Sequence, residues 1–280
     1  MQLSPVEFDA VRKIVRDRTA IVLDDDKSYL AETRLRTVAQ DEGFQSISEL
    51  VQRLGKNPSL DQRVIEAMAT NETYFFRDLQ PFEALRKELL PQLVARRGVM
   101  RRINIWSAAC ASGQEPYSIA LLLHEHHCLP DGWSVDLLAT DFSEVMLERA
   151  RQGRYNQVEV NRGLPAALLL KHFERHGLEW RIKDEIRRAV RFARINLIGN
   201  WPPLPPLDII FLRNVLIYFD VPTRKIILGK IRRVLRPDGY LFLGGAETTI
   251  NIDDAFERVP LDRASCFRLR SNEERNNVAV

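Results

Sequence analysis

Residues 103–118 constrain the fold of this chain more than any other stretch. They run Ile103-Asn-Ile-Trp-Ser-Ala-Ala-Cys110-Ala-Ser-Gly113-Gln-Glu115-Pro116-Tyr-Ser118, so an apolar run leads through small residues and a glycine into a helical pattern. A proline in a first helical turn loses no intrahelical hydrogen bond. The stretch therefore predicts a strand, a tight loop and a helix N-terminus. In an open α/β sheet this arrangement forms the crevice that holds nucleotide-like ligands, and the amides at the helix start attract anions.

The chain around this loop has the composition of a globular protein with one large and one small domain. It has 280 residues, of which 45% are hydrophobic and 28% charged, and a net charge of +3. No apolar run reaches the length of a membrane span, and the N-terminus lacks the pattern of a signal peptide. Three scattered cysteines are too few for a disulfide scaffold or a metal cluster. We expect a cytoplasmic protein with no metal and no membrane insertion.

From Pro81 onward, helical and strand patterns alternate, which predicts a mainly parallel sheet with helices on both faces. Pro91 is expected to kink the first helix. The expected strands are 102–106, 134–139, 208–212, 240–243 and 263–269, and the expected helices are 81–97, 115–127, 143–152 and 222–235.

Residues 1–76 predict a small helical domain, and residues 77–280 the sheet domain. Ser4-Pro5-Val6-Glu7 and Ser46-Ile47-Ser48-Glu49 both have the pattern of a capping box at a helix start. A helix over Lys27–Ala39 is expected to turn Leu30, Leu35 and Val38 inward and Arg34 and Arg36 outward.

Residues 179–193 break the alternation and predict a β-hairpin with Asp184-Glu185 near its turn, within an inserted subdomain of about 155–194. Residues 181–194 carry six basic side chains against two acidic ones. Such a patch can steer an acidic partner, although a solvated hairpin face accounts for the charge equally well. The polar tail from Ser271 is predicted to be disordered.

Asp141 ends the strand that follows the loop, at the position where a ribose diol is usually held. Capping of the next helix would explain Asp141 alone equally well, but together with residues 103–118 it favours a ribose ligand. The loop has a single glycine and lacks the dinucleotide glycine pattern. A nucleoside without phosphates therefore fits best, and S-adenosylmethionine (SAM) is the obvious candidate.

Two further stretches place polar residues where packing alone would not require them. In Asn71-Glu-Thr-Tyr-Phe-Phe-Arg-Asp78, the phenylalanines can hold the two domains together, but Asn71, Thr73 and Arg77 have no such use. Arg213 and Asn214 follow an apolar run, and their burial without partners would be costly. We expect Arg213 and Asn214, and Tyr218 with them, to face the crevice.

These blocks resemble those of the CheR-type chemotaxis receptor methyltransferases, which are protein-glutamate O-methyltransferases that use SAM. The resemblance extends in order over nearly the whole chain. It is carried by Asn71-Glu-Thr-Tyr-Phe-Phe-Arg77, Ser107-Ala-Ala-Cys-Ala-Ser-Gly-Gln-Glu-Pro-Tyr-Ser118, Ala139-Thr-Asp141, Ile195-Asn-Leu197, Arg213-Asn-Val-Leu-Ile-Tyr-Phe219, Leu235-Arg-Pro-Asp-Gly239 and Gly244-Gly-Ala-Glu247.

The resemblance implies a class I SAM-dependent methyltransferase (Rossmann-like) sheet with a helical N-terminal domain and an inserted β-hairpin subdomain. It implies that Arg77 and Tyr218 are catalytic, that S-adenosylhomocysteine (SAH) is the product, and that the partners are cytoplasmic domains of methyl-accepting chemoreceptors. The implied cofactor-binding residues are Asn71, Thr73, Arg77, Glu115, Asp141, Asn196, Leu197, Leu212, Arg213 and Asn214. The implied receptor-docking residues are Arg34, Arg36, Arg187 and Arg188.

Five positions depart from the family pattern. Ala111, Ser112 and Gln114 stand where Ser, Thr and Glu are usual, and Gly245-Ala246 replaces a usual His-Ser. The last change lies outside the blocks expected to be catalytic.

Other functions are weighed against this one. His124, His126 and His127 with Cys128 look metal-like but favour a solvated helix end, because no carboxylate stands at zinc spacing. Arginine pairs would suit a nucleic-acid methyltransferase, yet no aromatic residues alternate with them, and we expect no nucleic acid. A scaffold that senses SAM or docks receptors without turnover is the second hypothesis. A monomer is expected.

Overall fold

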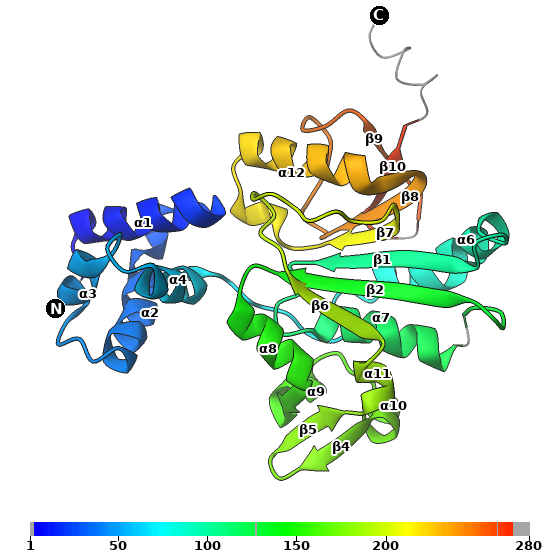
Figure 1. The fold of residues 1–280 in the computed structure, drawn as a ribbon, viewed down its shortest axis with the longest axis horizontal. Coiled ribbons are helices and arrows are strands. Elements are labelled where there is room, and N and C mark those ends of the chain that lie inside the picture. The colour runs from blue at the N-terminus through cyan, green and yellow to red at the C-terminus, as the bar shows by residue number, and fades with distance from the viewer. Residues whose placement is uncertain (1–2, 127, 262, 271–280) are drawn as a thin grey trace, which may run out of the picture. The chain divides into compact units, whose positions relative to one another are not determined.

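The computed structural model describes residues 3–126, 128–261 and 263–270, which group into two compact units (Figure 1). The helical unit comprises the chain up to Thr70 and the segment Tyr218–Arg224, and the sheet unit comprises Asn71–Ile217 and the chain from Lys225. The domain boundary expected at residue 76 stays a prediction. His127 and the tail from Ser271, for which disorder was expected, lie outside the described residues.

The helical unit is a small bundle around a core of aliphatic side chains that include Val11, Val15 and Leu35. The first capping box is confirmed, because Ser4 and Glu7 exchange side-chain-to-backbone hydrogen bonds. The second is only half formed: Ser46 accepts from the Glu49 amide, but the Glu49 carboxylate accepts from the Gln45 amide. Its helices are α1 (Pro5–Thr19), the 3₁₀ turn η1 (Asp25–Lys27), α2 (Ser28–Asp41), α3 (Ile47–Arg53) and α4 (Pro58–Met68).

Arg34 does not point outward, and that part of the prediction was wrong. Its half-buried guanidinium donates to the carbonyls of Met68 and Ala69 at 2.9 and 3.0 Å. The last carbonyls of a helix have no intrahelical donor, and Arg34 supplies one for α4. Burial lowers the pKa of Arg34. Arg36 is exposed, as expected, and pairs with Glu32 at 2.7 Å.

The sheet unit is built on a seven-stranded sheet in the order β6-β2-β1-β7-β8-β10-β9 (Figure 1). The first five of these strands run parallel, and β10 is antiparallel to both β8 and β9. This confirms the predicted Rossmann-like fold. The strands are β1 (Arg102–Ala108), β2 (Ser134–Asp141), β6 (Val190–Arg194), β7 (Leu207–Leu212), β8 (Leu235–Leu243), β9 (Phe256–Arg258) and β10 (Cys266–Leu269).

Helices precede the first strand and connect the parallel strands, close to the expected positions. The first of them contains a wide turn, η2 (Leu85–Leu89), directly before Leu90-Pro91. Proline cannot donate to the preceding turn, and such a widened turn is one way for a helix to accommodate it. The helices are α5 (Gln80–Ala84), α6 (Leu90–Arg96), α7 (Gln114–Glu125), α8 (Glu144–Gln152) and α12 (Val221–Val234), with the short η3 (Leu216–Tyr218) after β7.

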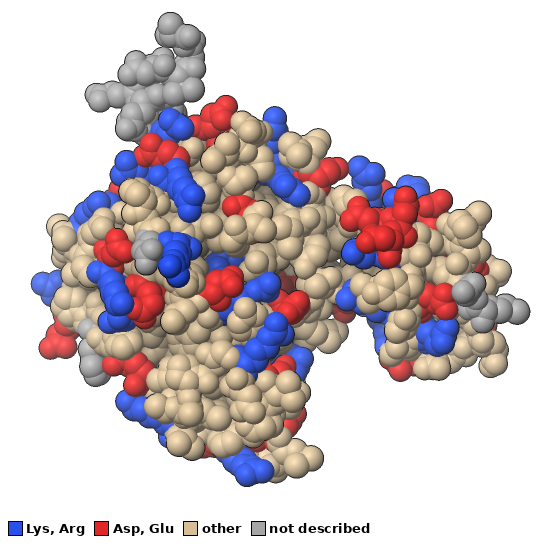
Figure 2. Space-filling view, turned by 180° about the vertical axis from the view of Figure 1, so that it is seen from behind, with Lys and Arg blue, Asp and Glu red and all other residues tan. Residues whose placement is uncertain are grey.

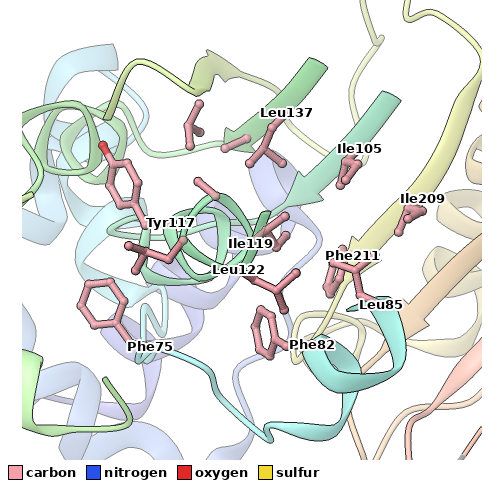
Figure 3. Packing of buried hydrophobic residues seen from close by; sticks show 14 of the residues in the cluster. Phe75, Phe82, Leu85, Ile105, Tyr117, Ile119, Leu122, Leu137, Ile209 and Phe211 are labelled. Atoms are coloured by element: carbon pink, nitrogen blue, oxygen red, sulfur yellow. The ribbon is translucent and has the colours of Figure 1, made fainter. Parts of the chain in front are cut away.

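The main core lies between the sheet and the helices α5 and α7 (Figure 3). Aromatic rings fill much of it: Phe82 stacks on Phe211 at 6.0 Å between centroids, and Phe211 on Phe242 at 4.7 Å. Phe75 belongs to the same cluster, so the segment that carries Arg77 is anchored in the core.

A segment of the chain between α8 and β6 forms its own small sheet, in the order β3-β5-β4. The hairpin predicted over 179–193 was wrong. Residues 179–182 pair with 173–176 across a turn at Gly177, whose φ of 62° suits a tight hairpin turn. Residues 190–194 instead join the main sheet beside β2. The elements of this inserted segment are β3 (Arg154–Asn156), α9 (Gln157–Asn161), α10 (Ala166–His172), β4 (Phe173–His176), β5 (Glu179–Ile182) and α11 (Asp184–Arg187).

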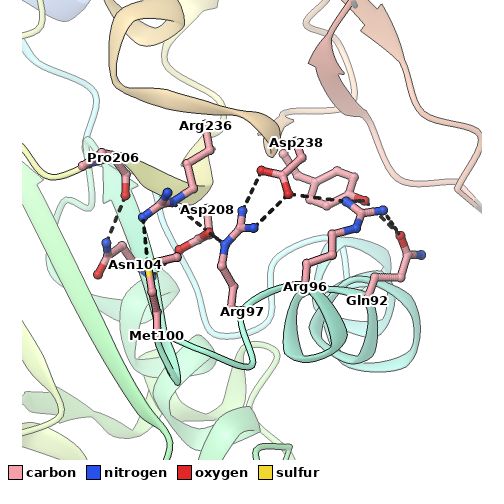
Figure 4. A network of polar contacts seen from close by, with 10 residues as sticks. Gln92, Arg96, Arg97, Met100, Asn104, Pro206, Asp208, Arg236 and Asp238 are labelled. Carbon is pink, nitrogen blue, oxygen red and sulfur yellow. Dashed lines mark hydrogen bonds and ion pairs between the residues drawn. The ribbon is translucent and has the colours of Figure 1, made fainter.

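A partly buried ion-pair network ties the end of α6 to the beginnings of β1, β7 and β8 (Figure 4). The Arg97 guanidinium donates to Asp208 at 2.7 Å and to both carboxylate oxygens of Asp238 at 2.6 and 2.9 Å. Asp208 is fully buried and also accepts from the Asn104 amide. The network therefore fixes the strand ends opposite to the loop of residues 109–113.

The surface is mixed in charge: on the face drawn in Figure 2, acidic and basic side chains alternate over most of the sheet unit. Among the described helices, none combines the length and the apolar character needed to cross a membrane.

Candidate active site

The loop after β1 is built by residues with positive φ. Ala109, Ala111 and Gly113 have φ values of 56°, 47° and 94°. Alternating left-handed residues turn the chain sharply from β1 into α7, and only small side chains tolerate this at low cost. A Cβ on Gly113 would lie 2.9 Å from the Ala150 Cβ, so this glycine also permits the close approach of α8. The predicted strand-loop-helix is confirmed.

Asp141 fastens this loop to the neighbouring strand. The buried carboxylate accepts from the Ala111 amide at 2.9 Å and from the Ser143 amide at 3.0 Å. The alternative that Asp141 caps α8 is wrong, because Ser143 is the N-cap and accepts from the Met146 amide. A carboxylate is a hydrogen-bond acceptor of the kind that a ribose diol requires.

Asn196 and Leu197 follow β6, the strand beside β2, and the Ile195 amide donates to the Asp141 carbonyl at 3.1 Å. Trp201 holds this turn, because its indole N–H lies 3.2 Å from the carbonyl oxygens of both residues. Lys230 donates to three successive carbonyls of the same turn, at 2.6 to 3.1 Å. The turn is thereby fixed next to Asp141.

Arg213 joins three segments that are far apart in the sequence. Its side chain is 1% exposed and donates to Glu115 at 3.0 Å, to the Arg77 carbonyl at 2.7 Å and to Asp78 at 2.9 Å. Ser107 at the end of β1 donates to the other oxygen of Glu115. Within the described part of the chain, the buried Arg213 Nε makes no hydrogen bond. The structure thus brings Arg77, Glu115 and Arg213 together at the carboxyl ends of β1 and β7.

The segment around Arg77 has an unusual backbone. Phe76 and Asp78 have φ values of 51° and 54°, on either side of Arg77. Strained conformations of this kind cluster at functional sites, where surrounding contacts hold them. The Phe76 amide donates to the Ser118 hydroxyl at 2.8 Å, and the Arg77 guanidinium donates to the Glu72 carbonyl at 2.8 Å.

The remaining predicted cofactor residues belong to the end of β7 and to the segment that carries Arg77. Leu212 is fully buried at the end of β7, and Asn214 follows it with a φ of 57°. Asn71 and Thr73 are half-buried at the start of the Arg77 segment. Their contacts with a cofactor stay predictions.

Glu247 was given no role in the sequence analysis, although its block was noticed. Its buried carboxylate accepts from the amides of Asn214, Val215, Ile217 and Gly244, at 2.6 to 3.2 Å. These bonds hold the loop after β7 in its left-handed turn. An acid that follows two glycines directly after an apolar strand was the signal that could have identified it.

For four of the predicted site residues the structure gives contacts that do not test their roles. Tyr218 groups with the helical unit, where its carbonyl accepts from the Val22 amide at 2.9 Å. Arg187 and Arg188 both pair with Asp184 in the inserted segment. The catalytic role of Tyr218 and the docking roles of Arg36, Arg187 and Arg188 stay predictions.

A group of potential metal ligands forms near the end of α7. His124, Glu125 and His172 have ligand atoms within 4.8 Å of one another. The Glu125 carboxylate already accepts from His172 at 2.6 Å and pairs with Lys171 at 2.8 Å. The Glu125 carboxylate is thus already used in contacts with His172 and Lys171, and we assign no metal to this group.

A mainly parallel sheet with a single-glycine loop and buried carboxylates at the strand ends is typical of SAM-dependent methyltransferases. Residues 71–265 match the family described as "CheR methyltransferase, SAM binding domain", and residues 6–69 match "CheR methyltransferase, all-alpha domain". The chain belongs to the CheR methyltransferase family.

Curated relatives match the chain over almost their whole length. "Chemotaxis protein methyltransferase 1" of Pseudomonas aeruginosa is 38% identical, over 96% of this chain and 100% of the relative. "Chemotaxis protein methyltransferase" of Vibrio parahaemolyticus is 37% identical, over 96% of this chain and 98% of the relative. The relative from Borreliella burgdorferi is 35% identical, over 86% and 88%.

Likenesses to solved structures are more distant. A TehB-like SAM-dependent methyltransferase from Corynebacterium glutamicum is 14% identical with a TM-score of 0.38, over 69% of this chain and 95% of that chain. PKMT2 from Rickettsia typhi in complex with AdoHcy is 12% identical with a TM-score of 0.37, over 62% and 26%. The family assignment rests on the sequence relatives.

Proposed function

We propose that this chain transfers the methyl group of SAM to glutamate side-chain carboxylates in the cytoplasmic domains of chemoreceptors and releases SAH. The observation that carries the proposal is the bridge made by Arg213, which holds the Arg77 backbone beside Glu115 at the crevice. The full-length match to chemotaxis protein methyltransferases supports the same substrate class.

The residues around the crevice fit SAM by their chemistry. Asp141 and Glu115 are buried acceptors, which suit a ribose diol and an ammonium group. The Arg213 Nε is a buried donor with hydrogen-bonding capacity to spare among the described residues. Asn71, Thr73, Asn196, Leu197, Leu212 and Asn214 would complete the site. Bound SAM supplies an electrophilic methyl group on a positively charged sulfur.

The task of the protein in this reaction is alignment. A glutamate carboxylate, with an ordinary pKa of about 4.3, is already ionised at neutral pH, so no strong general base is needed. Arg77 and Tyr218 orient the incoming carboxylate and exclude water from it. The contact between Arg77 and the substrate stays loose, because a tight ion pair would reduce the nucleophilicity of the carboxylate.

Receptor docking uses surfaces outside the crevice. Arg36 on α2 and the pair Arg187 and Arg188 in the inserted segment offer cations to acidic receptor helices and tails. Arg34 contributes to this surface indirectly, because it holds the end of α4. We propose a monomer that works in the cytoplasm.

Calorimetric titration with SAM and SAH tests the cofactor site. Wild-type protein is expected to bind both, and Asp141→Ala to weaken both by about 100-fold, because a buried acceptor for the cofactor is lost. Asp136→Ala is the matched control: Asp136 lies on the same strand but pairs with Arg102 and Arg191 near the opposite end. Wild-type protein that binds neither ligand would contradict the site.

A scaffold that senses SAM without turnover remains the second candidate. Under this hypothesis the chain would bind SAM but leave every receptor fragment unmodified. Methyl transfer to a receptor fragment therefore distinguishes the two functions.

A further inference from the structure

A loop of the inserted segment reaches the segment that carries Arg77. Arg162, between α9 and α10, donates to the Glu72 carboxylate at 2.6 Å. Its guanidinium also lies over the Tyr74 ring, 4.3 Å from the centroid, and the Arg77 guanidinium lies 5.5 Å from the same centroid. Two arginines from distant parts of the chain thus share one aromatic ring.

The contact between the two segments also involves the backbone. Gly163 has a φ of 85°, and a Cβ at this position would lie 2.0 Å from the Phe75 carbonyl oxygen. Phe75 packs edge-on against Tyr155 and Phe173 of the inserted segment, at 5.0 and 5.7 Å between centroids. These contacts hold the loop against the Arg77 segment and bring Arg162 close to Glu72 and Tyr74.

Arg162 and Arg77 differ in the group of Glu72 that each contacts. The Glu72 carboxylate pairs with Arg162, while the Arg77 guanidinium donates to the Glu72 carbonyl and forms no ion pair within the described ranges, so that its charge is available to a substrate. The Arg162 guanidinium holds the pKa of Glu72 below its usual range. Arg162 thus holds two residues, Glu72 and Tyr74, that in turn contact the Arg77 guanidinium.

We propose that Arg162 is a positioning residue for Arg77, so that the inserted segment takes part in the methyl-transfer step and not only in receptor docking. The proposal rests on the proposed function. Loss of Arg162 frees Glu72 and Tyr74, and the Arg77 guanidinium then moves away from the carboxylate that it orients. Misplacement of an orienting group by about 1 Å can reduce a rate by about 100-fold.

Steady-state methylation of a receptor cytoplasmic fragment by Arg162→Ala, Arg162→Lys and wild-type protein tests the proposal. For Arg162→Ala we expect kcat to fall about 10-fold or more, with KM for the fragment and the calorimetric Kd for SAM within about twofold of wild type. Arg162→Lys keeps the charge opposite Glu72 and should recover part of kcat. The ion pair is half exposed and contributes little to folding, so the melting temperature should not change.

Arg154→Ala is the matched control, since Arg154 is an exposed arginine of the same segment that makes no ion pair within the described ranges. It should leave kcat unchanged. Glu72→Gln should lower kcat as Arg162→Ala does, and the double variant should be no worse than either single one, because both act through one contact.

Three results would overturn the proposal: an unchanged kcat in Arg162→Ala, a rise in KM for the receptor fragment alone, or an equal loss of SAM affinity. The second would assign Arg162 to docking and the third to the cofactor site. Wild-type protein without any transfer activity would defeat the proposed function itself, which is a different outcome from an active wild type and an unaffected variant.

Discussion

At the scale of single residues, the site depends on side chains that bridge segments. Arg213 is buried, and a buried guanidinium is stable only where acceptors surround it. Glu115, Asp78 and the Arg77 carbonyl provide them. Arg213 therefore fixes the backbone of Arg77, and Glu72 fixes its guanidinium. This holds the Arg77 side chain in place while it can still donate to a substrate carboxylate.

Replacement of Arg77 separates orientation of the substrate from cofactor binding. Arg77→Ala should lower kcat by about 100-fold or more, because it removes the cation that orients the carboxylate, while Kd for SAM changes by about threefold or less. Steady-state methylation and calorimetry measure the two quantities.

Arg86→Ala is the control, since Arg86 pairs with Glu83 on the surface side of α5 and η2. Equal losses of turnover and SAM affinity in Arg77→Ala would defeat this role. Full activity in Tyr218→Phe would remove the tyrosine hydroxyl from the mechanism.

At the scale of elements, the strands, loops and helices that depend on a local sequence pattern were predictable from the sequence. The strand, loop and helix of residues 103–118 were predictable, and so was the place of Asp141, because the carboxyl ends of adjacent parallel strands meet at one edge. The hairpin of β4 and β5 was not predictable, because β4 carries Glu174, Arg175 and His176 and its polar sequence has no apolar alternation. Its pairing with β5 depends on tertiary packing.

Long-range polar contacts escaped prediction for a similar reason. Arg34 lies at a position typical of a solvated helix face, and only the end of α4 beside it explains its burial. Glu247 accepts from amides that lie about thirty positions earlier in the chain. No periodicity in the sequence reports such pairs.

The contact between α7 and α10 predicts a pH dependence of stability. The Glu125 carboxylate, held by Lys171 and His172, has its pKa lowered to about 2. A lowered pKa in the folded state means that this carboxylate stabilises the fold fully above its ordinary pKa of about 4.3, and that the contribution is lost as the pH falls toward 2.

Urea denaturation of wild type and Glu125→Gln across this pH range measures the effect. Wild type should be the more stable at pH 7, and the difference in free energy of unfolding should shrink as the pH falls from about 4.3 to about 2. The control is Glu179→Gln, an exposed carboxylate on β5. A difference that stays constant over this range would show that Glu125 is not held as described.

At the scale of the whole sheet unit, the Arg97 ion-pair network and the proposed active site lie at opposite ends of the same strands. The Arg97 network fixes the beginnings of β1 and β7 (Figure 4), and the proposed site lies at their carboxyl ends. In doubly wound sheets ligands bind at the carboxyl ends, beside the point where the strand order reverses. Here the chain runs outward from β1 to β2 and β6, then returns to β7 on the other side. Asp141 ends β2, and Glu115 and Arg213 follow β1 and β7, the strands at that point.

Methyl transfer to a receptor tests the central claim most directly. The full chain is incubated with methyl-labelled SAM and the cytoplasmic fragment of a methyl-accepting chemoreceptor, and the labelled peptides are mapped by mass spectrometry before and after treatment with base. We predict label on glutamate side chains, its release by base as methanol because a methyl ester hydrolyses, and its loss with Arg77→Ala. Protein that binds SAM but labels no receptor fragment, or labels only base-stable positions such as lysine, would contradict the account.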